Sequence, residues 1–107
     1  MEVLDNFMRG DIREEILASV EVVYNYTKLA SYNGTLYFTA NKIYWLCAEY
    51  ERIILSSWCI NANEIATYKK KGLAGYTITL KDGKSISLSN IFRKKREALT
   101  AALQKLV

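Results

Sequence analysis

Short runs of alternating apolar and polar residues dominate the chain from residue 20 onward, and they predict a series of β-strands. In the first run, Val20, Val22, Tyr24 and Tyr26 alternate with other residues, which is the pattern of a half-buried strand. The pattern predicts about seven strands in all, the later six over residues 35–39, 42–48, 52–60, 65–70, 76–81 and 85–89. Segment 42–48 is apolar on both faces, which predicts a place inside the sheet or beneath another element.

Turn residues separate these runs. Asn33-Gly34 and Asp82-Gly83 are the clearest turn signals, because asparagine, aspartate and glycine tolerate the positive φ that tight hairpins need. Weaker turn signals occur at residues 39–41, 49–51 and 72–75. The strands are therefore expected to be antiparallel and joined by short loops.

The last part of the chain predicts one amphipathic helix over residues 91–106, with Asn90 as its N-cap. Its apolar stripe consists of Phe92, Leu99, Leu103 and Leu106. Such a stripe can seal the open end of a sheet or barrel.

The first residues predict a helical leader. A short helix is expected over residues 1–10, ended by Gly10, and a second over residues 12–18, preceded by a capping-box pattern. The predicted organisation is a leader over residues 1–19 and one domain over residues 20–107.

Composition narrows the class of protein. The chain has 107 residues, half of them hydrophobic, and no run approaches the roughly 20 apolar residues that span a bilayer. The acidic start lacks a signal-peptide pattern, so the cytoplasm is the expected location. Cys47 and Cys59 are expected to be buried thiols. Without histidine, no metal site is expected.

The sequence also predicts a protein that is not an enzyme. It lacks a histidine base, a nucleophile motif and a glycine-rich phosphate loop. Neither cysteine has an evident partner that would lower its pKa. No catalytic residue and no cofactor are therefore expected.

From residue 20 to residue 106 the chain resembles the pleckstrin-homology-like (PH-like) superfold, and in particular its bacterial PH and GRAM branches. The resemblance rests on Gly34-x-Leu-x-Phe-Thr-x-Asn-Lys-Ile43, Trp58, Ile65, Ile78-x-Leu80-x-Asp82-Gly83, and the helix residues Phe92 and Leu99. It implies two nearly orthogonal antiparallel sheets, forming a partly open barrel, with the helix plugging one corner.

Many PH domains bind phosphoinositides through basic residues of the first hairpin. In this chain only Lys28 matches that pattern, and residues 35–39 contain no cation. Recognition of a polyvalent phosphate needs several converging cations. This departure from the family pattern therefore argues against binding of a specific phosphoinositide.

Two basic clusters stand out, Lys69-Lys70-Lys71 and Arg93-Lys94-Lys95-Arg96. The topology is expected to bring them to one end as a single patch for anionic lipid, nucleic acid or an acidic peptide. The alternative is a solvated helix face that raises solubility. Cations in the first turn of a helix oppose its dipole, which makes the second cluster unusual.

Tyr37, Tyr44 and Trp45 supply more aromatic surface than a small core hides, so they are candidate interface residues. The first functional hypothesis is a non-catalytic interaction module that binds a protein or a second copy of itself. The second is weak electrostatic binding to anionic membranes, with a location peripheral to the membrane. The third is nucleic-acid binding.

Overall fold

The computed structural model describes residues 1–47 and 57–107. In these residues the chain is mainly β, with one C-terminal helix, as the sequence predicts. The strands are β1 (Glu2–Leu4), β2 (Ala18–Thr27), β3 (Ala30–Phe38), β4 (Lys42–Cys47), β5 (Ser57–Asn61), β6 (Ile65–Lys71), β7 (Gly75–Leu80) and β8 (Ser85–Ser89), and the helix is α1 (Arg93–Leu106). The turn expected at 49–51 and the first part of the strand expected over 52–60 lie outside the described residues.

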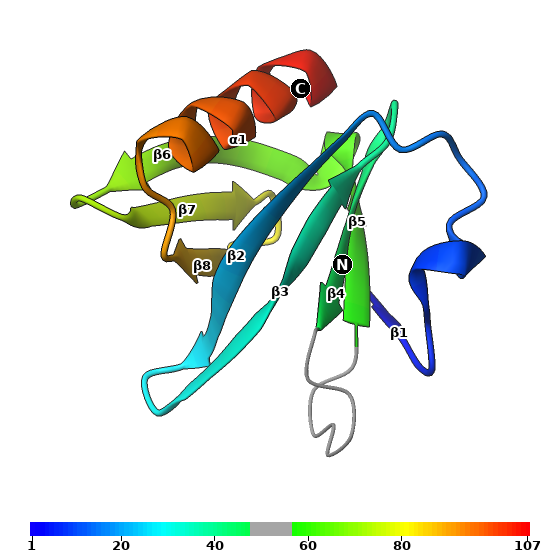
Figure 1. The fold of residues 1–107 in the computed structure, drawn as a ribbon, viewed down its shortest axis with the longest axis horizontal. Helices are drawn as coiled ribbons and strands as arrows, with labels where there is room; N and C mark the ends of the chain where they lie inside the picture. Colours follow the sequence, from blue (N-terminus) through cyan, green and yellow to red (C-terminus); the bar gives the residue numbers. More distant parts are fainter. Residues whose placement is uncertain (48–56) are drawn as a thin grey trace.

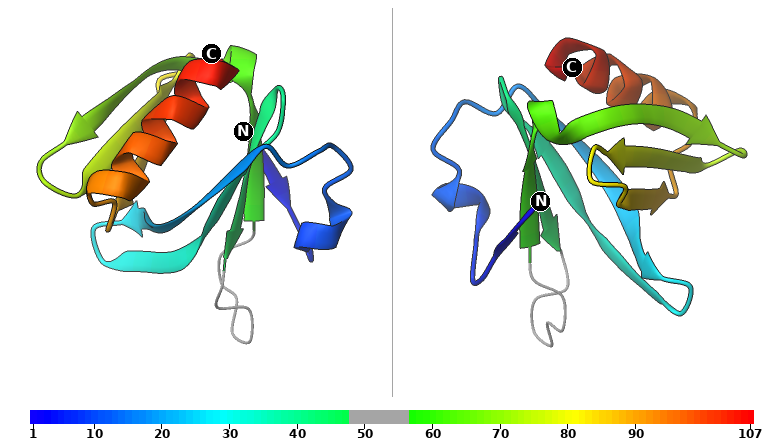
Figure 2. Two further views of the ribbon diagram at one scale, coloured as in Figure 1. Left: turned by 45° about the horizontal axis from the view of Figure 1, so that its top comes forward. Right: turned by 180° about the vertical axis from the view of Figure 1, so that it is seen from behind.

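The eight described strands form one open antiparallel sheet in the order β1-β5-β4-β3-β2-β8-β7-β6. β2 and β3 pair along almost their whole length, whereas β2 and β8 pair through only three residues of each strand. The sheet folds over at this short junction, and α1 lies across the opening between its two wings (Figures 1 and 2). The expectation of two nearly orthogonal sheets is therefore not matched: the described strands form one sheet, because β2 hydrogen-bonds to both wings.

The first hairpin turns at a different place from the one predicted. Asn33 and Gly34 lie inside β3, where they pair with Val23 and Val22 of β2. The chain reverses instead at residues 28–29, between the two strands. A strong local turn signal is overridden here by the pairing and packing of the whole strand.

The expected helical leader is also absent from the structure. β1 pairs antiparallel with β5, only a single 3-10 turn forms at Arg9–Asp11, and residues 12–17 contain no helix. The backbone of β1 satisfies hydrogen-bonding groups along the edge of β5. An extended leader can therefore cover more of the sheet than two short helices would.

The core lies between the two wings and α1. Leu99 and Leu103 are completely buried, as the helical stripe predicts, but Phe92 is 57% exposed and Ile91 is buried in its place. Asn90 is not the N-cap: its φ of 61° is left-handed, and the helix begins after Phe92. This conformation, which asparagine tolerates, turns the chain so that the Ile91 amide donates to the carbonyl of Ala74.

Candidate functional site

The aromatic residues expected at an interface divide between the two faces of the sheet. Trp45 points inward and is completely buried, with its ring centroid 5.4 Å from that of Tyr24 and 6.3 Å from that of Trp58. Glycine at position 34 leaves room for this indole, since a Cβ there would lie 2.5 Å from Trp45 Cη2. The expectation that Trp45 lies exposed at an interface is therefore wrong.

Tyr44 points to the outer face of the sheet, where the leader covers it. The Phe7 ring stacks on the Tyr44 ring with 5.5 Å between centroids. The Tyr44 hydroxyl donates to both carboxylate oxygens of Glu14, at 2.9 and 3.0 Å. Only 6% of Tyr44 remains exposed, so it is not a surface residue either, because the chain's own leader occupies that surface.

The contact between Tyr44 and Glu14 moves the pKa of each group further from neutral pH. Burial, assisted by the Glu14 carboxylate, raises the pKa of Tyr44 to about 12. Hydrogen bonds from the Glu14 backbone amide and from the Tyr44 hydroxyl lower the pKa of Glu14, and Lys42 Nζ at 3.8 Å contributes as well. A neutral hydroxyl thus donates to a charged carboxylate, an arrangement that stabilises the leader on the sheet.

Tyr37 is half-buried beside Tyr44, its partner across the β3–β4 pair. The guanidinium carbon of Arg9, in the leader, lies 5.6 Å from the Tyr37 ring centroid, which is within cation–π range. Of the three predicted interface aromatics, Tyr37 therefore keeps the most accessible surface, and even it is partly covered by the leader.

The two basic clusters are brought together by one of their own members. Arg96 Nη2 donates to the carbonyl oxygens of Gly72 and Gly75, each at 2.9 Å. These carbonyls belong to the β6–β7 turn, directly after Lys71. The turn and the start of α1 therefore lie side by side (Figures 1 and 2). The contact also explains a cation in the first helical turn, since Arg96 binds carbonyl oxygens outside the helix.

The remaining cations point in several directions. Lys70 pairs with buried Tyr76 and so lies on the core side of β6, whereas Lys69 and Lys71 lie on the opposite side. Successive helix residues diverge by about 100°, and half-buried Lys95 lines a separate hollow together with Glu21. The five exposed cations of the two clusters, here called the basic edge, are Lys69, Lys70, Lys71, Arg93 and Lys94.

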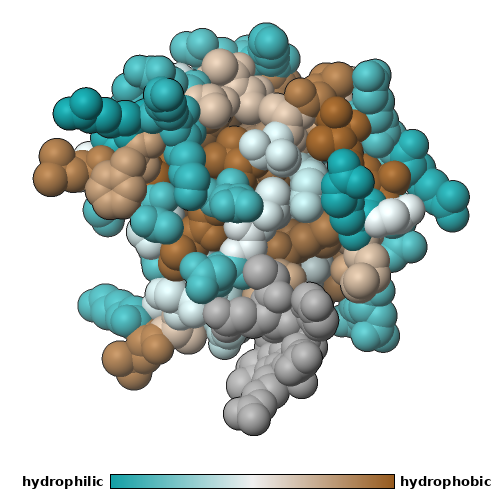
Figure 3. Space-filling view, in the orientation of Figure 1, coloured by the Kyte–Doolittle hydropathy of each residue, from teal (hydrophilic) through white to brown (hydrophobic). Residues whose placement is uncertain are grey.

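Two exposed apolar side chains lie within the basic edge. Leu73, at the tip of the β6–β7 turn, is 91% exposed, and Phe92 is 57% exposed. Each is one residue away from the hydrogen bond between the Ile91 amide and the Ala74 carbonyl, at 2.9 Å, so the backbones of Leu73 and Phe92 lie close together. Apolar and hydrophilic groups protrude together at this side of the molecule (Figure 3). The sequence carries one signal for this exposed side chain, a leucine directly after Gly72 in a turn.

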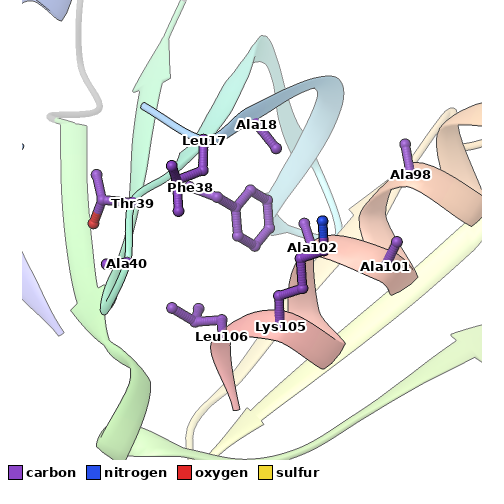
Figure 4. A pocket seen from close by; sticks show the side chains of 10 residues that line it. All are labelled: Leu17, Ala18, Phe38, Thr39, Ala40, Ala98, Ala101, Ala102, Lys105 and Leu106. Atoms are coloured by element: carbon purple, nitrogen blue, oxygen red, sulfur yellow. The ribbon is translucent and has the colours of Figure 1, made fainter. Parts of the chain in front are cut away.

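A shallow groove of about 320 Å³ lies at the other end of α1 (Figure 4). Phe38 points into it, while the helical wall consists of Ala98, Ala101, Ala102, Lys105 and Leu106. Leu17, on the opposite side, is 58% exposed. The groove can accept an apolar side chain, and no sequence pattern had indicated it.

The cysteines offer no chemistry beyond that of thiols. Cys47 pairs with Gly34 and Cys59 with Tyr44, so their side chains lie on opposite faces of the sheet and cannot form a disulfide. Burial raises the pKa of the Cys59 thiol, and nearby Glu2 raises it further. Among residues 1–47 and 57–107, no cluster of three or more His, Cys, Asp or Glu side chains is placed to hold a metal ion.

No helix in the described part of the chain is both long and apolar enough to cross a bilayer. That finding concerns α1, whose exposed side carries charges and alanines.

Comparison with known proteins supports the fold without a sequence relationship. No protein-family model matches the chain, and no curated protein is significantly similar to it in sequence. Among solved structures, the C-terminal domain of an unknown protein from Leishmania infantum matches with a TM-score of 0.72 and 17% identity, covering 87% of this chain and 84% of that one.

Two structures of the DH/PH domains of p115-RhoGEF match with TM-scores of 0.71 and 0.70 at 7% and 8% identity. They cover 88% and 87% of this chain, which spans less than a third of theirs, at 29% and 30%. The chain therefore has a PH-like fold. Membership of the bacterial PH or GRAM branches remains a prediction.

Proposed function

We propose that this protein is a non-catalytic interaction module that binds an extended anionic surface through the basic edge. The observation that carries the proposal is the pair of hydrogen bonds from Arg96 to Gly72 and Gly75, because they hold the two basic clusters together. The five cations of the basic edge point outward from two elements and do not converge on one point. Such a distribution suits a laterally extended anionic surface better than a single phosphate group.

The strength of this binding follows from the number of cations. Each Lys or Arg near an anionic surface contributes about 1 kcal/mol, so the basic edge supplies about 5 kcal/mol and a dissociation constant in the sub-millimolar range. Charge alone therefore gives weak binding that salt abolishes.

A charge-reversal experiment tests the proposal. Lys71→Glu combined with Lys94→Glu lowers the net charge from +4 to 0, that is by 2 for each substitution. This double variant is expected to elute from immobilised heparin at clearly lower salt than wild type. The loss should be roughly 2 kcal/mol or more, about thirtyfold in affinity.

The matched control is Lys28→Glu combined with Lys84→Glu, which gives the same net charge but changes the β2–β3 and β7–β8 turns. It should elute close to wild type. Equal losses in the two double variants would mean that net charge, and not the basic edge, governs binding, and the proposal would then be rejected.

Self-association is a second candidate function, favoured by the groove beside α1. Exposed Leu17 borders the groove, so a two-fold axis next to it would place Leu17 of each copy against the groove of the other. The aromatic face does not support this function, since the leader covers Tyr44 and the core encloses Trp45.

A further inference from the structure

We infer that the anionic surface recognised by the basic edge is a lipid bilayer, and that Leu73 and Phe92 insert into it. This inference rests on the proposed function and names the partner of the same site. Both side chains are exposed and large, and both lie among cations.

The local backbone presents the two side chains together. Gly72, with a φ of 62°, allows the tight turn that places Leu73 at its tip. Arg96 then fastens this turn to the start of α1, and the Ile91 amide bonds to the Ala74 carbonyl. Leu73 and Phe92 therefore project from a braced edge, so little further ordering is needed on binding.

The apolar side chains beside the cations favour a bilayer over other anionic partners. A soluble polyanion such as heparin offers sulfate and carboxylate groups but no apolar phase for Leu73 and Phe92. An anionic membrane offers both charge and an apolar phase: its headgroups can bind the cations, and the acyl chains beneath them can take up the two apolar side chains. Lys70, Lys71 and Lys94 can remain at headgroup level while the two apolar side chains reach below it.

The test measures binding to vesicles of phosphatidylcholine with and without phosphatidylserine. Wild type is expected to bind the vesicles that contain phosphatidylserine. Leu73→Ser combined with Phe92→Ser should weaken that binding about tenfold for each residue, since a tenfold change is ~1.4 kcal/mol and full burial of such a side chain is worth more. Its elution from heparin should stay unchanged, because its cations are intact.

The matched control is Leu29→Ser, which removes an equally apolar side chain, 99% exposed, from the tip of the β2–β3 turn. It should bind vesicles as wild type does. Leu73 and Leu29 are almost wholly exposed, whereas Phe92 is 57% exposed and is the N-cap residue of α1, a position where serine is favourable. Each variant should therefore keep a single cooperative thermal unfolding transition, and that measurement excludes misfolding as the cause of any loss.

Leu73→Trp adds a direct measure of insertion. Brominated acyl chains should quench the fluorescence of this variant, whereas Trp45 and Trp58 of wild type are buried and should be quenched little. The insertion is overturned by any of three results: undiminished vesicle binding of the double serine variant, an equal loss in Leu29→Ser, or no vesicle binding by wild type. If heparin elution still depends on Lys71 and Lys94, the proposed function survives those results, and if it does not, the proposed function fails separately.

Discussion

Gly34 shows how one residue without a side chain decides the packing of a strand pair. A Cβ at this position would lie 2.4 Å from the carbonyl oxygen of Leu46 and 2.5 Å from Trp45 Cη2. The first contact is with backbone, which cannot rotate away. The space at position 34 therefore admits only glycine, because the Leu46 backbone and the Trp45 indole both lie against it. Beside Asn33, the same glycine resembles a turn residue in the sequence.

Gly34→Ala is expected to lower the free energy of unfolding by about 1–3 kcal/mol, the usual effect of overpacking a core. Thermal unfolding followed by the tryptophan signal measures this. The control is Gly10→Ala, since a Cβ at Gly10 has no neighbour within 4 Å and its φ is not left-handed. Equal melting temperatures of the two variants would show that Trp45 has room for the methyl group.

At the scale of elements, the leader is a cover for one face of the sheet. It pairs with β5 through β1, stacks Phe7 on Tyr44, and places Glu14 at the Tyr44 hydroxyl. Covering this face leaves little of the aromatic surface available to a partner. The cover supports the proposal that binding takes place at the basic edge and not at the aromatic face.

The contact between Glu14 and Tyr44 predicts a pH dependence of the leader. The pKa of Glu14 is lowered in the folded protein, so its contribution to stability is complete above the ordinary value of 4.5 and is lost as the pH falls through the folded value. The wild type is expected to be more stable than Tyr44→Phe at neutral pH, and this difference should shrink below pH 4.5.

Chemical denaturation at a series of pH values measures that difference, and the protection of the amides of residues 5–17 against hydrogen exchange, relative to the intrinsic rate at each pH, should fall in the same pH range. Taking the difference between two variants removes the titration of other carboxylates, such as Glu64, whose pKa is also lowered. A difference independent of pH would show that Glu14 does not hold the leader through Tyr44.

At the scale of the whole molecule, α1 carries different surfaces at its two ends. Its first turn belongs to the basic edge, and its last turns form one wall of the groove. Binding at the basic edge and association through the groove are predicted to respond oppositely to salt, because salt screens electrostatic attraction but also reduces repulsion between like-charged copies.

Ala101→Arg tests whether copies associate through the groove. Light scattering of wild type is expected to show an average mass that rises with protein concentration and with salt, and Ala101→Arg should remain a monomer because a charged side chain would fill the groove. Ala66→Arg, at an exposed position of β6, makes the same charge change away from the groove and should behave as wild type. A wild type that stays monomeric at all concentrations would rule out self-association.

The elements that the sequence predicted well are those with local causes. The alternation of apolar residues on β7 and β8 and the Asp82-Gly83 turn between them needed no distant partner, and Gly83 has the expected left-handed φ of 93°. The stripe of Leu99 and Leu103 likewise predicted a helix that seals the core. The positions of these strands and of the helix along the chain could be anticipated because each depends on neighbouring residues and on burial of one face.

Only the tertiary structure decided where surfaces are exposed. Trp45 and Tyr44 differ from exposed aromatics because Gly34 and the leader lie against them, and neither contact leaves a periodic signal in the sequence. The basic clusters were visible in the sequence, but they lie side by side only because the Arg96 side chain binds two carbonyl oxygens more than twenty residues away. Leu73 and Phe92 are likewise distant in the sequence, and only the fold brings them close together. The sequence by itself determined most of the strands and the helix, because their causes are local, whereas contacts between distant residues determined the extended leader, the place of the first turn and which surfaces stay exposed.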